Sequence, residues 1–207
     1  GVLLWFSRIF SFNEDGSDIE VLTQSRSFRA LGFRQDGGSI VALDVPGEEN
    51  NILMTRDYVP EMTVGTRLAN EESGLGVDAV DITNRRRKVV ERPDDKASAF
   101  VADETGRVRL KVLSARRGDG TLLGRRMYYY RPAGDDGWRE FEQVTIDGKE
   151  RTDFVPAAVD SKRNVVYGWD TIGGYDAIVE VKLDGSGEGR VVMMRDDVDV
   201  DIVSILR

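Results

Sequence analysis

The segment FVADETGRVRL at residues 100–110 and the segment PAAVDSKRNVV at residues 156–166 follow one pattern. In each, small or apolar residues lead to an aspartate, a short polar turn follows, and a second apolar run closes the segment. Two apolar runs on either side of a polar turn predict a β-hairpin. A looser third copy, RQDGGSIV, lies at residues 34–41. The recurrence of one such unit predicts a fold built from repeats.

Polar turns recur along the chain as a second landmark. Asn84, Gly134 and Asp184 stand at intervals of 50 residues, and each lies between two strand-like runs, the second pair being 127–131 and 141–146. A repeat of about 40 to 50 residues with four short strands is typical of a β-propeller blade. We therefore predict an all-β fold, a partial β-propeller of four-stranded antiparallel blades. A β-sandwich or a two-domain β protein is the competing fold.

The expected organisation is a single, incomplete propeller domain spanning residues 1–207. Its blades are expected at residues 27–92, 97–148 and 153–195, with partial blades at 1–24 and 196–207. Propellers close with about four to eight blades, so this count predicts an open ring. An open ring leaves blade edges exposed, which favours self-association with another copy.

Composition excludes several classes of function. The 207 residues include 37 Asp and Glu against 29 Lys and Arg, a formal net charge of −8, which argues against nucleic-acid binding. The sequence has no Cys and no His. Thiol nucleophiles, imidazole metal sites and a Ser-His-Asp triad therefore cannot be built from this chain. No cofactor and no metal are expected, and the only N-terminal apolar run, residues 2–6, is too short to cross a membrane.

Several segments, taken in their order and spacing, resemble the propeller of bacterial prolyl oligopeptidase family serine peptidases, of the dipeptidyl or acylaminoacyl peptidase type. They are NILMTRDYVPE at 51–61, ESGLGVD at 72–78, RMYYYR at 126–131 with Trp138, FVPAAVD at 154–160, NVVYG at 164–168 and LDGS at 183–186. The resemblance covers residues 29–201. It implies a propeller that caps an α/β-hydrolase domain and admits only short or unfolded peptides. It also implies that hydrolase domain and peptides as partners, and a periplasmic location.

The catalytic part of that family is not found in this sequence. There is no G-x-S-x-G nucleophile elbow, and the nearest string, GSGEG at residues 185–189, has its serine beside the first glycine. We therefore expect no catalytic residue and no enzymatic activity in this chain, although the resemblance implies a serine peptidase as the parent protein.

Four residues are candidates for substrate gating. The resemblance implies paired propeller carboxylates that hold the free α-amine of a peptide, and Glu71 and Glu72 are such a pair. Arg56 and Tyr58, in the same long connection, are candidates for contacts with the peptide. The alternative for all four residues is an exposed loop that binds nothing.

Three further patterns carry a structural alternative beside the functional one. DGSGEG at residues 184–189 partly imitates a calcium loop, or is a plain hairpin turn. Asp197, Asp199 and Asp201 alternate with apolar residues, which on a strand puts three carboxylates on one face, either to bind a cation or to face solvent. Aromatic residues either form a binding shelf or pack between sheets. They are Tyr128, Tyr129, Tyr130, Trp138, Tyr167 and Trp169.

Two other functions compete with the peptidase-associated propeller. One is a stand-alone protein-interaction propeller similar to the TolB type. The other is a carboxylate-dependent glycosidase, which needs two acidic residues about 5 to 9.5 Å apart and no histidine.

Overall fold

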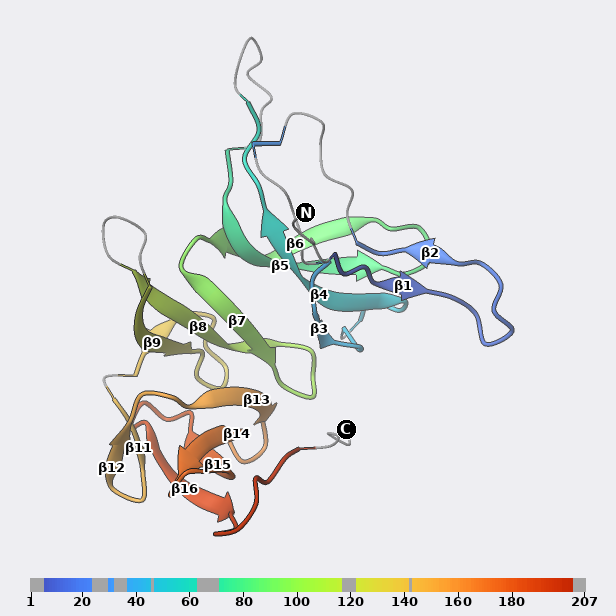
Figure 1. The fold of residues 1–207 in the computed structure, drawn as a ribbon. Helices are drawn as coiled ribbons and strands as arrows, with labels where there is room; N and C mark the ends of the chain where they lie inside the picture. Colours follow the sequence, from blue (N-terminus) through green and yellow to red (C-terminus); the bar gives the residue numbers. More distant parts are fainter. Residues whose placement is uncertain are drawn as a thin grey trace, which may run out of the picture. The chain divides into compact units, whose positions relative to one another are not determined.

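The computed structural model describes residues 6–23, 30–31, 37–45, 47–62, 71–116, 122–141 and 143–202. The prediction of an all-β fold is confirmed, because this part of the chain forms 16 strands and no helix (Figure 1). None of it therefore has the length and apolar character of a membrane-spanning helix. The chain forms two compact units, Gly1–Ala97 and Ser98–Arg207. Whether they belong to one ring-shaped domain stays a prediction.

The first unit holds a two-stranded hairpin and a four-stranded antiparallel sheet. The hairpin pairs β1 (Phe10–Ser11) with β2 (Glu20–Val21). The sheet has the order β3 (Ile40–Ala42), β4 (Asn51–Tyr58), β5 (Gly74–Asp81) and β6 (Arg87–Asp94). Leu22 from the hairpin packs with three residues of the sheet, which makes the core of this unit. They are Ile52, Met54 and Val80.

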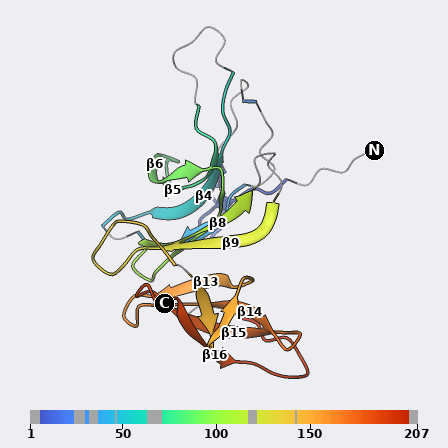
Figure 2. The ribbon, with the colours of Figure 1, turned by 90° about the vertical axis from the view of Figure 1, so that its left-hand side faces the viewer.

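The second unit is built from two sheets. One has the order β10 (Arg139–Glu140), β9 (Leu122–Tyr130), β8 (Val108–Arg116) and β7 (Ala97–Ala102). The other has the order β12 (Lys149–Arg151), β11 (Val144–Ile146), β16 (Glu188–Met193), β15 (Tyr175–Lys182), β14 (Val165–Ile172) and β13 (Val155–Asp160). Figure 2 shows β13 to β16 of this sheet. β11 pairs in parallel with β16, whereas β10–β9, β8–β9, β11–β12, β13–β14, β14–β15 and β15–β16 pair antiparallel.

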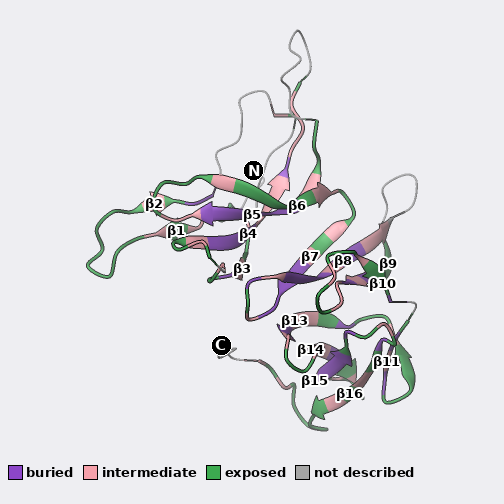
Figure 3. Ribbon diagram, turned by 180° about the vertical axis from the view of Figure 1, so that it is seen from behind, coloured by how far each residue is buried: buried purple, intermediate pink, exposed green. Residues whose placement is uncertain are grey.

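Aromatic residues join the two sheets of the second unit. Because side chains alternate along a strand, Tyr128 and Tyr130 point into the core and are 5% and 4% exposed. The Tyr130 ring stacks on Phe141 with centroids 4.5 Å apart, and the Tyr128 hydroxyl donates to the Phe154 carbonyl at 2.6 Å. Figure 3 shows buried stretches on the central strands of both units. Each fully buried aromatic side chain of this kind stabilises the fold by roughly 1.5–3 kcal/mol.

The prediction of turns at 50-residue intervals is confirmed. The turns connect β5 to β6, β9 to β10, and β15 to β16, one turn in each of the three larger sheets. In two of them an aspartate carboxylate accepts hydrogen bonds from the backbone and hydroxyl of the residue two positions later. Asp81 accepts from Thr83 at 2.8 and 2.6 Å, and Asp184 accepts from Ser186 at 2.9 and 2.6 Å. This local bonding favours a turn over continued pairing.

Residues 100–110 and 156–166 each run from one strand through a turn into the next, as predicted. The third copy lies partly outside the described residues, at Arg34–Asp36, and its described part leads into β3. In the β3–β6 sheet, the connection between the first two strands, which corresponds to the β7–β8 and β13–β14 connections, is the β3–β4 loop. It ends at Asn50, which has φ +64° as Asn164 has φ +54° before β14. Asparagine tolerates this left-handed backbone better than most other residues that carry a side chain, so it fits the position before each of the two strands.

The predicted strand at 141–146 is wrong in its pairing. β10 takes the place opposite β9, whereas Val144–Ile146 pairs in parallel with β16 in the other sheet. Gly187 permits this close approach: its φ is +65°, and a Cβ there would lie 2.0 Å from the Gln143 carbonyl oxygen. Thr145 N donates to the Gly187 carbonyl at 2.9 Å. Strand propensity predicted the segment but carries no information about its partner.

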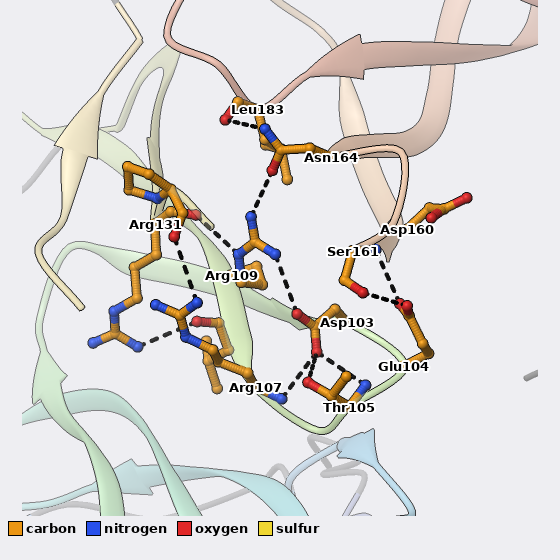
Figure 4. Close-up of polar contacts among 12 residues, drawn as sticks. Asp103, Glu104, Thr105, Arg107, Arg109, Arg131, Asp160, Ser161, Asn164 and Leu183 are labelled. Atoms are coloured by element: carbon orange, nitrogen blue, oxygen red, sulfur yellow. Dashed lines mark hydrogen bonds and ion pairs between the residues drawn. The ribbon is translucent and has the colours of Figure 1, made fainter. Parts of the chain in front are cut away.

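Arg109 provides a polar link between the two sheets of the second unit (Figure 4). Its guanidinium is 2% exposed and donates to Asp103 Oδ2 at 3.2 Å, the Arg131 carbonyl at 2.9 Å and Asn164 Oδ1 at 2.7 Å. Asn164 Nδ2 in turn donates to the Leu183 carbonyl at 2.9 Å. The buried charges are therefore paired and hydrogen-bonded, as burial requires.

We expect Arg109→Met to lower the free energy of unfolding by about 3–5 kcal/mol, because it leaves the Asp103 carboxylate buried without its counter-charge. Urea unfolding monitored by tryptophan fluorescence measures the change. Arg195→Met is the matched control, since it breaks the exposed Arg195–Asp197 pair and should cost less than about 1 kcal/mol. Equal losses in the two variants would contradict the assigned role of Arg109.

Candidate functional site

The structure brings Arg56 and Tyr58, on β4, together with Asp78, on β5. The Tyr58 hydroxyl donates to Asp78 Oδ1 at 2.6 Å, and Arg56 Nη1 lies 3.2 Å from Asp78 Oδ2. The Arg56 guanidinium also lies over the Tyr58 ring, 4.0 Å from its centroid. The Asp78 side chain is 0% exposed, so this cluster is part of the interior and not an open surface.

A second arginine completes this cluster and ties it to the hairpin. Arg87, on β6, lies 3.4 Å from Asp78 Oδ2 and donates to the Leu22 carbonyl. Burial lowers the pKa of the Arg87 guanidinium, and the Asp78 charge opposes that effect. Burial and the hydrogen bond to Asp78 raise the pKa of Tyr58. Sequence reasoning missed Asp78, although a lone charged residue within the apolar run 75–80 is the signal that would have found it.

Glu71 and Glu72 are exposed and lie just before β5, separated from it by Ser73. The Glu72 charge contributes to the raised pKa of Tyr58, so Glu72 belongs to the same end of the β4–β5 pair as the Tyr58 cluster. The four gating candidates are thus divided into a buried pair, Arg56 and Tyr58, and an exposed pair of carboxylates. Their role in gating stays a prediction.

An open pocket of about 370 Å³ lies against the other unit's last sheet. It is called the aspartate pocket below, because five of its lining residues are aspartates. The lining residues are Asp153, Val155, Trp169, Asp170, Thr171, Asp176, Asp199, Val200 and Asp201. A concentration of negative charge around an indole ring attracts cations and hydroxyl-bearing ligands.

Two hydrogen-bonded contacts build the aspartate pocket. Asp170 is 3% exposed, and its Oδ2 accepts from Arg151 Nε at 2.7 Å. Asp199 Oδ1 accepts from the backbone N–H of Asp176 at 2.8 Å, and Val200 N donates to the Asp176 carbonyl at 2.9 Å. These bonds hold the segment after β16 beside the start of β15, where it forms one wall of the pocket.

The predicted strand through Asp197, Asp199 and Asp201 does not form. Residues 194–202 contain no strand, and the three carboxylates have separate roles. Asp197 pairs with Arg195 at 2.8 Å, Asp199 bonds to β15, and Asp201 accepts from the N–H of Ile202 at 2.7 Å. Local bonds to the aspartate side chains replace a strand ladder here. The alternation correctly singled out two residues of the pocket, Asp199 and Asp201, for the wrong geometric reason.

In the DGSGEG segment, residues 184–187 form the β15–β16 turn and Glu188 and Gly189 begin β16, in line with the hairpin alternative. The hydrogen bond from the Ser186 hydroxyl lowers the pKa of Asp184, and Glu188 pairs with Lys182 at 2.8 Å. In the described part of the chain, no group of three or more His, Cys, Asp or Glu side chains is arranged to hold a metal ion.

The aromatic candidates divide between core and surface. Tyr128 and Tyr130 are core residues, as described above. Tyr129 and Trp138 are half-buried, and the Lys111 ammonium lies 5.4 and 5.3 Å from their ring centroids. Tyr167 accepts a hydrogen bond from Arg163. Trp169 lines the aspartate pocket.

No protein-family model, no curated protein and no solved structure matches this chain.

Tyr58→Phe tests the buried cluster through its pH dependence. Tyr58 keeps its proton better in the folded than in the unfolded state, so its stabilising contribution is complete below about pH 10 and is lost as pH rises further. We expect Tyr58→Phe to cost roughly 1.5–3 kcal/mol at pH 7 and to show a shallower loss of stability above pH 10 than the parent chain. Urea unfolding at pH 7 and above pH 10 measures both effects.

Tyr128→Phe is the companion variant for this test. Burial raises the pKa of Tyr128 to about 12, so removal of this hydroxyl should also flatten the alkaline loss of stability. Its hydrogen bond goes to a carbonyl instead of a carboxylate, so its cost at pH 7 should be smaller, roughly 0.5–1.5 kcal/mol. An alkaline slope as steep in Tyr58→Phe as in the parent chain would disprove the coupling of Tyr58 to Asp78.

Proposed function

We propose that this chain is a non-catalytic β-propeller segment that scaffolds and gates the hydrolase domain of a serine peptidase acting on short peptides. The observation that carries the proposal is the strand order. Three sets of four consecutive strands, β3–β6, β7–β10 and β13–β16, are each hydrogen-bonded in chain order, and β11 and β12 extend the third sheet. Such repetition with stacked sheets is typical of propeller blades.

The packing within each unit supports the same proposal. In the second unit, two consecutive sheets share one apolar core, as neighbouring blades do. In the first unit, the β1–β2 hairpin packs through Leu22 against the β3–β6 sheet, as the outer half of an earlier blade would. A repeat architecture of this kind buries apolar surface only between neighbours.

The chemistry of the side chains supports a non-catalytic role. The sequence has no His and no Cys, so a proton shuttle for a serine nucleophile must come from elsewhere in the parent protein. The chain can attract a peptide electrostatically. The aspartate pocket and the net charge of −8 favour the cationic N-terminus of a peptide over its carboxylate end.

The proposal predicts that the purified chain does not hydrolyse peptide p-nitroanilides. Release of nitroaniline is followed at 405 nm, with a serine peptidase of known activity as positive control. Turnover that persists through repurification and gel filtration would refute the non-catalytic role. Sequencing of the gene beyond Arg207 tests the peptidase assignment separately. A G-x-S-x-G elbow and a later His are expected there. Their absence would favour the alternative function, a protein-interaction propeller.

The aspartate pocket favours a second candidate function, a carboxylate-dependent glycosidase. Trp169 offers a flat ring for a sugar, and Asp153 and Asp201 are two lining carboxylates that contribute from different segments. Glycoside hydrolysis needs only such a pair and no histidine. The pocket therefore contains the two acidic residues that a carboxylate-dependent glycosidase requires.

A panel of p-nitrophenyl glycosides separates the two candidates. The leading proposal predicts no release of nitrophenol from any of them. Activity that falls by at least about a hundredfold in Asp153→Asn or Asp201→Asn, with an unchanged unfolding midpoint, would replace it with the glycosidase. Asp197→Asn, outside the pocket, is the matched control and should change nothing.

A further inference from the structure

The turn between β7 and β8 contacts the turn between β13 and β14, and the two turns belong to different sheets of the second unit (Figure 4). Glu104, in the first turn, accepts two hydrogen bonds from Ser161, in the second. Its Oε2 accepts from the Ser161 N–H at 3.0 Å, and its Oε1 accepts from the Ser161 hydroxyl. We call this pair the turn latch. Its two residues are 57 positions apart in the chain, so the latch joins two sheets and does not shape a single turn.

Two other contacts join the same sheets near the turn latch. Asp103 and Val159 form an isolated parallel bridge, and Arg109 donates to Asn164 at 2.7 Å. Asp103 is only 2% exposed, whereas Glu104 is half-buried and in contact with solvent. Of these two acidic residues in the β7–β8 turn, Glu104 is therefore the one that can take up a proton from water without opening the core.

The surroundings of Glu104 favour its carboxylate form. Burial alone would raise the pKa of Glu104, but the hydrogen bonds from Ser161 and the positive charge of Lys162 outweigh burial, so the pKa lies below its ordinary value of 4.5. Arg163, the next cation in the β13–β14 turn, pairs with Glu180 at 3.0 Å. The turn latch is therefore formed with Glu104 charged at neutral pH.

The neighbouring carboxylates have their own partners. Asp103 pairs with Arg109 at 3.2 Å, and Asp160 Oδ1 accepts from the Arg163 N–H at 2.9 Å. Neither aspartate is needed as an acceptor in the turn latch. Loss of the Glu104 charge would therefore act on the turn latch and leave the bonds of both aspartates in place.

We propose that Glu104 and Ser161 form an acid-sensitive latch between the two sheets of the second unit, closed while Glu104 is a carboxylate and released when Glu104 takes up a proton. Hydrogen bonds to a carboxylate are about twice as strong as those to a neutral acceptor, and a protonated carboxyl group has lost part of its acceptor capacity. The inference does not depend on the peptidase assignment.

The direction of the pKa shift sets the pH range of the release. Because the folded state holds the pKa of Glu104 below its value in the unfolded chain, the latch contributes fully above about pH 4.5. Its contribution is lost as pH falls through the lowered pKa. The aromatic core between the sheets contains no group that titrates in this range, so the sheets should stay packed while the turns separate.

Amide hydrogen exchange of the full chain, followed by NMR, tests the latch directly, because the Ser161 N–H is one of its two donors. Exchange is measured at pH 7 and at about pH 3.5, and each rate is divided by the rate expected for an unfolded chain at the same pH. We expect the protection of Ser161 to fall by about tenfold between the two conditions. The amides of β14 and β15 should keep their protection.

Two variants separate the charge from the rest of the latch. Glu104→Gln removes the charge and keeps the shape of the side chain, so Ser161 should lose protection already at pH 7 and show no further acid dependence. Ser161→Ala removes the hydroxyl donor from the other turn and should show an intermediate loss at pH 7.

Asp184→Asn is the matched control. Asp184 accepts from the Ser186 N–H at 2.9 Å and from its hydroxyl at 2.6 Å, the same chemistry within the single β15–β16 turn. This variant should release Ser186 and leave the protection of Ser161 unchanged.

Three results would overturn the proposal. Equal protection of Ser161 at both pH values would show that protonation does not release the latch. A simultaneous loss of protection across β14 and β15 would show general acid unfolding in place of a local release. Exchange of Ser161 that is as fast in Asp184→Asn as in Glu104→Gln would show that its protection reports overall stability and not the bond to Glu104.

Discussion

Sheet-on-sheet packing in the unit of residues 98–207 depends on how Arg109 is held. Its guanidinium is almost fully buried, so each of its contacts must replace a bond to water. Asp103 supplies the counter-charge from the turn before β8, and Asn164 supplies an acceptor from the turn before β14. The two hairpins that share a sequence pattern are thus connected through one side chain, and the aromatic core between the sheets closes around that connection.

Buried charge serves the same purpose in the unit of residues 1–97. Asp78 accepts from Tyr58 and pairs with Arg56 and Arg87, and Arg87 bonds to the backbone of Leu22. Residues that resemble ligand contacts in the sequence are here contacts between secondary-structure elements. The open pocket lies in the other unit, beside β13, β14 and β15, where five aspartates surround Trp169.

Much of the fold could be predicted because its signals are local. Alternating apolar residues predict strands. An aspartate two residues before Thr or Ser favours a turn through local hydrogen bonds, as at Asp81 and Asp184. The candidate site was predictable only in part. Asp199 and Asp201 stood out by their spacing, whereas Asp153, Asp170 and Asp176 lie in separate segments and meet only in the folded chain.

The sequence by itself determined the all-β class, the hairpin repeats and the absence of thiol and imidazole chemistry, because propensity, turn bonding and composition act within a few residues. Tertiary structure alone decided which strands are neighbours. The parallel pairing of β11 with β16 depends on the close approach at Gly187, and the burial of Asp78 depends on two arginines from other strands. Such contacts join residues far apart in the chain, and the free energy that selects them comes from packing, which no local pattern encodes.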